Sequence, residues 1–123
     1  MSKADVEILK AGSVVLVRFP FTSLESSKKR PALVLKEVGF TQNIKIFIIA
    51  MITSQIESPN IDGDFELKDW SAAGLLHPSR VRLAKIASVE NLLVEKKLGH
   101  ISSQDKAGLL KHFGKLFKGL IAN

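Results

Sequence analysis

Residues 44–52 of the chain read IKIFIIAMI, and this stretch is the strongest indication of the fold class. After Lys45 every side chain is apolar, and most of them are β-branched. A short apolar run of this kind is typical of a strand that is covered on both faces. It is also far shorter than the ~20 residues that a membrane-spanning helix needs. The stretch therefore predicts a central, buried β-strand.

Further strands are predicted on both sides of this stretch. Pro20 ends the first of them, and Pro31 opens the second, because proline cannot donate a hydrogen bond to a neighbouring strand. The polar residues 22–30 between these two strands are predicted to form a loop. The predicted strands cover residues 14–19, 32–38, 44–52, 64–67 (a short edge strand) and 80–89, with one more short strand around Leu98.

The carboxyl-terminal residues follow a different period. Their apolar side chains recur every three or four positions, which indicates an amphipathic helix over about residues 103–121. Ser102 is the expected N-cap, and Asp105 is expected in the first turn, where the helix dipole favours an acid. The prediction is a single domain over residues 1–123, of the mainly β class. It is a small antiparallel β-barrel with strands over about residues 13–101 and a carboxyl-terminal helix packed on it.

The composition excludes some kinds of site and favours a negatively charged partner. The chain has 123 residues and no cysteine, which excludes disulfides and thiolate metal sites. Its formal net charge is +6, although residues 57–69 hold five acids and one lysine, so the rest of the chain carries +10. A basic body attracts polyanions, and nucleic acid is the commonest of these. No signal-like or membrane-spanning segment is recognised, so a cytoplasmic protein without a membrane partner is expected.

Two junctions between loop and strand are the best candidates for chemistry. In the first, Lys28, Lys29 and Arg30 precede Pro31, and a guanidinium there offers a planar fork for phosphate oxygens. In the second, Thr53, Ser54 and Gln55 follow the buried strand, where their hydroxyl and amide groups can hold a phosphate or read a base edge.

The three histidines offer much less. His77, His100 and His112 have no metal-ligand spacing, so no metal or other cofactor is expected. An acid/base pair of two of these histidines stays open, since the sequence does not indicate which two would meet.

These motifs resemble the MazF/PemK family of toxin ribonucleases. The resemblance begins with GSVVLVRFPFT at residues 12–22 and a Ser/Lys-rich loop, followed by KRPALVL at 29–35. ITSQ at residues 52–55, PSRVRL at 78–83 and KLGHIS at 97–102 are similar to later motifs of the family. The resemblance spans about residues 11–120.

The resemblance implies a barrel of the CcdB/MazF type that acts as a homodimeric, metal-independent endoribonuclease on single-stranded RNA and is held in check by a cognate antitoxin. It assigns the catalytic core to Arg30 and Thr53, with Glu25 as a further catalytic candidate. Many relatives have an acid where this chain has Ala84, so the general base must be found elsewhere, for example in Glu25.

We expect Arg30 to contact the nonbridging phosphate oxygens, with Thr53 donating a second hydrogen bond. The remaining candidates are expected to bind RNA: Lys28, Lys29, Ser54, Gln55, Arg80 and Arg82. Three alternatives stay open. The first is a non-catalytic barrel that binds RNA or protein, which Ala84 favours. The second is a CcdB-like gyrase poison, which would not need the Arg30 and Thr53 motifs, and the third is a basic structural domain whose helix packs on a partner.

Overall fold

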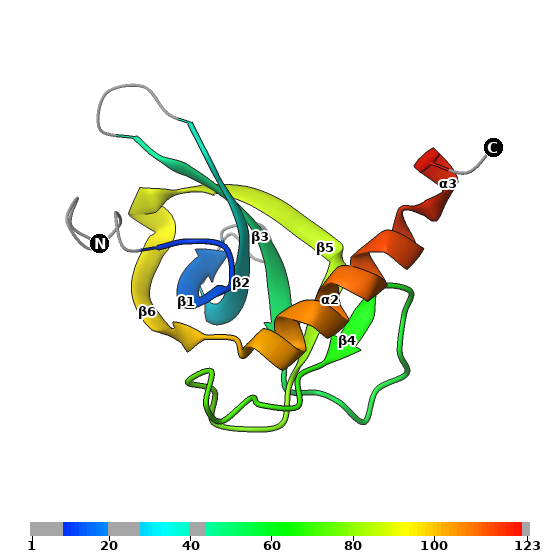
Figure 1. Ribbon diagram of the computed structural model, residues 1–123. Coiled ribbons are helices and arrows are strands. Elements are labelled where there is room, and N and C mark those ends of the chain that lie inside the picture. The colour runs from blue at the N-terminus through cyan, green and yellow to red at the C-terminus, as the bar shows by residue number, and fades with distance from the viewer. Residues whose placement is uncertain (1–8, 20–27, 40–43, 122–123) are drawn as a thin grey trace.

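The computed structural model describes residues 9–19, 28–39 and 44–121, and the six strands within these ranges form one curled sheet (Figure 1). The strands, in chain order, are β1 (Ser13–Phe19), β2 (Lys28–Val38), β3 (Ile46–Thr53), β4 (Asp64–Glu66), β5 (Arg80–Glu90) and β6 (Val94–His100). Their order in the sheet is β4-β5-β3-β2-β1-β6, and all pairings are antiparallel.

The predicted fold class is confirmed: a mainly β, antiparallel structure with a carboxyl-terminal helix packed on it. β4 and β6 are the two ends of the strand order, so the curled sheet stays open between them in the described part of the chain.

The central strand β3 is covered on both faces, as the apolar run predicts. Phe47 and Ile49 point into one core cluster, while Ala50 and Ile52 point into the other. Successive side chains of a strand point to opposite faces, so a strand between two cores must be apolar at every position.

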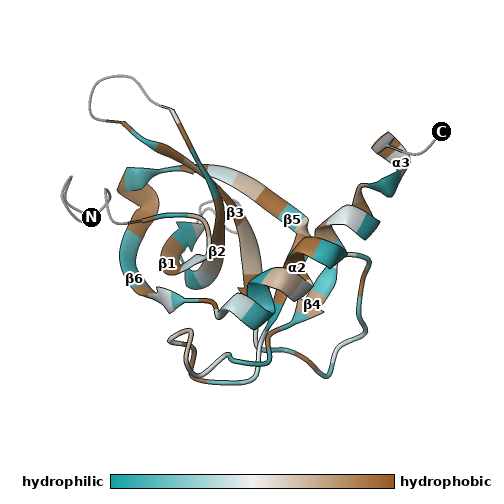
Figure 2. Ribbon diagram, in the orientation of Figure 1, coloured by the Kyte–Doolittle hydropathy of each residue, from teal (hydrophilic) through white to brown (hydrophobic). Residues whose placement is uncertain are grey.

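The helix α2 (Ser103–Leu116) covers one face of the sheet, where Leu109 joins the core cluster of β3 and β5. Its hydrophobic and hydrophilic residues alternate in bands along the ribbon, as expected for an amphipathic helix (Figure 2). Ser102 is the N-cap, and its hydroxyl accepts the backbone N–H of Asp105 at 3.1 Å. The buried Asp105 carboxylate in turn accepts the N–H groups of Lys68 and Asp69 at 3.0 and 2.9 Å. The predicted cap therefore also fastens the helix to the chain that follows β4.

Three boundaries differ from the prediction. β2 begins at Lys28 rather than after Pro31, because Lys28–Arg30 pair with Val17–Phe19 of β1. β6 is a full strand of seven residues, paired along β1, where only a short strand around Leu98 was predicted. The helix ends before Phe117, whose backbone is no longer helical (φ −101°, ψ 16°). A separate short helix, α3 (Lys118–Ile121), follows.

No helix among the described residues has both the length and the apolar composition to cross a membrane.

Candidate active site

Arg30, Thr53 and Arg80 lie in one row across three neighbouring strands. Thr53, the last residue of β3, pairs with Arg80, the first residue of β5. The ladder of β2 and β3 ends at the pair of Ala32 and Met51, and Arg30 and Thr53 each lie two residues beyond this pair, so alternation puts their side chains on the same face of the sheet. The register thus brings the guanidinium and the hydroxyl of the two sequence motifs to one side of the molecule.

Arg30 is held in a half-buried position on this face, across from Val17 of β1. Its Nε is buried, and within the described part of the chain this nitrogen has no hydrogen-bond partner. An unmade hydrogen bond at a buried donor costs about 1–3 kcal/mol, so an acceptor supplied by a ligand would recover that energy. The position suits the binding of an anion.

Thr53 ends the central strand with its hydroxyl at the edge of the site. Its Oγ1 accepts the backbone N–H of Gln55 at 3.2 Å, which turns the chain out of the sheet. Accepting this bond leaves the hydroxyl hydrogen able to donate to a ligand.

Arg80 has a different place from the one expected. Its side chain is 0% exposed and donates to Asp64 Oδ2 at 3.1 Å, to the carbonyls of Gln55 at 2.9 Å and Ser58 at 2.7 Å, and to Asn60 Oδ1. A guanidinium that is enclosed in this way has no surface to offer RNA, so the prediction of direct contact disagrees with its burial. Arg80 instead ties the segment after β3 to the sheet.

Arg82 lies one row further along the same face and is more open. Its side chain is 15% exposed, and its Nη1 lies 3.9 Å from Asp64 Oδ2. Arg82 pairs with Met51, whereas the next β3 residue, Ala50, pairs with Ile86. The β5 residues between these pairs bulge out of the ladder, and the exposed Ala84 lies in this bulge.

Asp64 is the partner of these arginines, and the sequence analysis does not single it out. Its side chain is 1% exposed, it contacts both Arg80 and Arg82, and its Oδ1 is buried without a partner in the described part of the chain. The signal was present, because alternation along the predicted edge strand puts Asp64 and Glu66 on the face opposite to Phe65. One carboxylate of the acidic stretch of residues 57–69 therefore lies against the two arginines of β5.

The other two cations predicted at this junction, Lys28 and Lys29, directly precede Arg30 on β2. Lys28 and Lys29 are exposed on β2, and Lys29 Nζ lies 3.8 Å from Glu95 of β6. Glu95 also accepts a hydrogen bond from Arg18, and this bond lowers the pKa of the Glu95 carboxyl below its ordinary value. Glu25 lies outside the described residues.

Ser54 and Gln55 line a polar pocket beside Thr53. The pocket has a volume of about 480 Å³ and is formed by residues 54–58 on one side and by His77 and Pro78 on the other. Both predicted RNA-binding residues are exposed at its surface.

The other two histidines, His100 and His112, contact neighbouring protein groups. The ring nitrogens of His100 lie 2.7 Å from the carbonyl of Ile101 and 3.2 Å from that of Ala11. His112 packs edge-on against Phe65 with 4.9 Å between ring centroids. Among the described residues, no three His, Asp or Glu side chains gather as a metal site would require.

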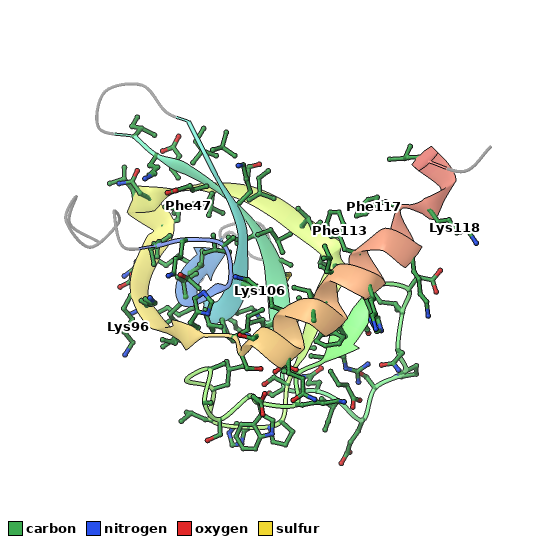
Figure 3. The ribbon with its side chains drawn as sticks, in the orientation of Figure 1. Phe47, Lys96, Lys106, Phe113, Phe117 and Lys118 are labelled. Atoms are coloured by element: carbon green, nitrogen blue, oxygen red, sulfur yellow. The ribbon has the colours of Figure 1, made fainter. Side chains whose placement is uncertain are left out.

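A second, apolar groove lies between α2 and the sheet, away from the row of Arg30 and Thr53. It measures about 700 Å³, and its lining includes Leu35, Ile48 and Ile86 from the sheet and Leu110 and Phe113 from the helix. Phe113 packs on Phe117 with 4.7 Å between ring centroids, and both project from the carboxyl-terminal part of the helix (Figure 3). Leu110 is 73% exposed, so the groove has an apolar rim.

Solved structures that are similar to this chain include MazF toxins. The chain is similar to the Mycobacterium tuberculosis toxin MazF-mt6, with 16% identity, a TM-score of 0.66, and coverage of 86% of this chain and 96% of that one. It is similar to an endoribonuclease bound to its cognate antitoxin from a mycobacterial species (10% identity, TM-score 0.62, coverage 89% and 95%). It is also similar to MazE-MazF from Deinococcus radiodurans (18% identity, TM-score 0.63, coverage 94% and 99%).

A search among curated protein sequences finds no match. A family model does match residues 10–117, which is most of the chain, and its description is a PemK-like, MazF-like toxin of type II toxin-antitoxin systems. The resemblance of the sequence motifs is thereby confirmed. Because the family model matches residues 10–117, this chain belongs to the PemK-like, MazF-like family of toxins.

Proposed function

We propose that this toxin is a metal-independent endoribonuclease that cleaves single-stranded RNA. The observation that carries the proposal is the cross-strand row of Arg30 and Thr53, with a buried, unpartnered Nε on Arg30. Both groups donate hydrogen bonds from one face of the sheet, so a phosphate between them would receive two donors. The basic charge of the chain outside residues 57–69 supports a polyanionic substrate.

The reaction uses a nucleophile that belongs to the substrate. The ribose 2′-oxygen attacks the adjacent phosphorus, the bond from phosphorus to the 5′-oxygen breaks, and a 2′,3′-cyclic phosphate and a 5′-hydroxyl result. The enzyme therefore has to orient the two oxygens and stabilise the additional negative charge on the phosphorane. Arg30 binds the nonbridging oxygens, and Thr53 donates the second hydrogen bond.

Proton transfer needs a base for the 2′-hydroxyl and an acid for the leaving 5′-oxygen. Glu25 is the proposed base. Asp64 is poorly suited to that role, because its carboxylate is 1% exposed and already contacts Arg80 and Arg82. Arg82, with part of its side chain open to solvent, orients the phosphate or assists the leaving oxygen.

The test is cleavage of a long RNA of mixed sequence in the presence of EDTA, followed by mapping of the new 5′ ends. We expect discrete cuts with 5′-hydroxyl termini and no cleavage of DNA of the same sequence, which lacks the 2′-hydroxyl. Arg30→Ala should lower the rate ~100- to ~1000-fold, the usual cost of losing one preorganised donor. Lys111→Ala, an exposed cation on α2, is the control and should cleave normally. Full activity of Arg30→Ala would reject the assignment.

A non-catalytic RNA-binding barrel is the second candidate, and Ala84 favours it, because an acid of the family pattern is missing there. The same assay separates the two candidates. Intact RNA together with binding that depends on Arg30 would select the non-catalytic barrel.

We further propose that the toxin works in the cytoplasm, as a homodimer, and that a cognate antitoxin inhibits it. Two of the similar structures are complexes with an antitoxin, which supports that partner. Addition of the antitoxin should stop RNA cleavage at an equimolar ratio.

For the homodimer, we assign the apolar groove to a second copy of this chain. Leu110 and Phe113 of α2 line the groove and are themselves exposed, so two copies of the chain related by a two-fold rotation can cover each other's apolar surface. Exposed apolar patches of this kind mark protein interfaces. Light scattering should give twice the monomer mass of 13.5 kDa, and Phe113→Asp should give a folded monomer. A dimer that survives this substitution would place the interface elsewhere.

A further inference from the structure

We infer that the polar pocket beside Thr53 is a nucleobase subsite, which reads one base of the single-stranded RNA next to the bond that is cut. The pocket is formed by Ser54, Gln55, Ile56, Glu57, Ser58, His77 and Pro78. The inference rests on the proposed ribonuclease function and adds to it a recognition element that the catalytic row does not contain.

The position of the pocket follows from the end of one strand pairing. Thr53 and Arg80 are paired where the ladder of β3 and β5 ends. One wall, residues 54–58, is the chain that leaves Thr53, and the other wall, His77 and Pro78, is the chain that approaches Arg80. Both walls therefore begin beside Thr53, the residue that we assign to the scissile phosphate. A base of the nucleotide next to that phosphate is then close enough to enter the pocket.

The chemistry of the lining suits a base better than a phosphate. The pocket has no lysine or arginine in its lining, and it includes the carboxylate of Glu57, which would repel a second phosphate. Gln55 offers an amide, and His77 offers an imidazole face. Unstacked RNA bases are bound by stacking on such rings and by hydrogen bonds to their edges. Neither the Gln55 amide nor the His77 ring makes a hydrogen bond to another described residue, so both are available.

Arg80 gives this pocket its shape. It donates to the carbonyls of Gln55 and Ser58 and to the side chain of Asn60, so the loop wall is held by a guanidinium rather than by a strand or helix. On the opposite wall the hydroxyl of Ser79 donates to the carbonyl of His77 at 2.7 Å. Fixing both walls before the ligand arrives reduces the entropy lost on binding. Arg80 is thus a positioning residue for the subsite, and its burial agrees with that role.

The test compares cleavage maps rather than rates alone. Wild type, Gln55→Ala, His77→Ala and the double variant are incubated with the same RNA library, with Lys111→Ala as the control. We expect the variants to cleave still, but to lose the preference for one nucleotide adjacent to the cut. On an oligonucleotide with the preferred base, kcat/KM should fall ~5- to ~150-fold, mostly through KM, as expected for loss of one base contact. An unchanged map for the double variant would overturn the inference.

Two further measurements keep the outcome interpretable. Asn60→Ala removes one partner of Arg80 without burying an unpaired charge, and it should change the base preference in the same direction as the pocket variants. If wild type does not cleave, the ribonuclease proposal fails, and the subsite is tested by fluorescence anisotropy with 2′-deoxy oligonucleotides. The double variant should then bind more weakly than wild type to one base and equally to the others. Equal binding to every base by both proteins would overturn the subsite itself.

Discussion

Replacing Asp64 by asparagine removes the negative charge that faces the buried guanidinium of Arg80. The two side chains are 1% and 0% exposed, and Asp64 Oδ2 lies 3.1 Å from Arg80 Nη1 and 3.9 Å from Arg82 Nη1. Asparagine has nearly the same shape, so the packing is preserved. What changes is that the two arginines lose the carboxylate that contacts both of them.

The loss of stability expected for Asp64→Asn follows from the burial of Arg80 and Asp64. Leaving one charge of a buried pair without its partner costs about 3–5 kcal/mol. Arg80 keeps its bonds to the carbonyls of Gln55 and Ser58, so the lower end of this range, about 3 kcal/mol, is expected for Asp64→Asn. Against a usual total of about 5–15 kcal/mol, this is a large share of the free energy of unfolding.

Urea unfolding of Asp64→Asn beside Asp62→Asn measures this difference. Asp62 is exposed in the turn two residues before Asp64, so its substitution removes the same charge close by without touching the arginines. We expect a change of less than about 0.5 kcal/mol for the Asp62 variant, as is usual for exposed sites. Equal stability of the two variants would refute the view that the buried ion pair of Asp64 and Arg80 helps to hold residues 55–60 against the sheet.

Two further substitutions test local features of the fold. Ser102→Ala removes the N-cap acceptor of the Asp105 N–H and should destabilise the protein by about 1 kcal/mol, whereas Ser102→Thr should not; equal unfolding midpoints for Ala and wild type would contradict the cap. Arg18→Gln removes the hydrogen bond that lowers the pKa of Glu95, so that pKa should rise toward its ordinary value in an NMR titration. The pKa of Glu95 is lower in the folded state than in the unfolded state. The small stabilisation by the exposed pair of Arg18 and Glu95 is therefore present above the unfolded-state pKa and is lost as the pH falls through the folded-state pKa. An unchanged Glu95 pKa in Arg18→Gln would contradict the hydrogen bond between the two side chains.

Much of the fold was predictable because its elements are written in local patterns. The buried strand, the edge strand and the capped helix each follow from the period of apolar residues and from one or two end signals. The boundary of β2 was missed because the polar Lys28–Arg30 segment becomes a strand through pairing with β1, a partner distant in sequence. The length of β6 was missed for the same reason, since its pairing with β1 comes from the other end of the chain.

The candidate site shows the same division. Arg30 and Thr53 were recognisable as a guanidinium and a hydroxyl at loop-strand junctions, each on its own. The burial of Arg80 and Asp64 was not predicted, because a sequence shows their charges but not which charges become enclosed. Burial depends on the segment of residues 55–60 folding back over Arg80, and no local pattern indicates that contact.

By itself the sequence determined the chemical groups available to this protein and the strands and helix that carry them, because hydrophobic periodicity and capping act over a few neighbouring residues. Only the tertiary structure decided which of these groups share a face. A shift of one residue between β2 and β3 would turn Arg30 and Thr53 to opposite sides, and that register is set by long-range strand pairing and packing.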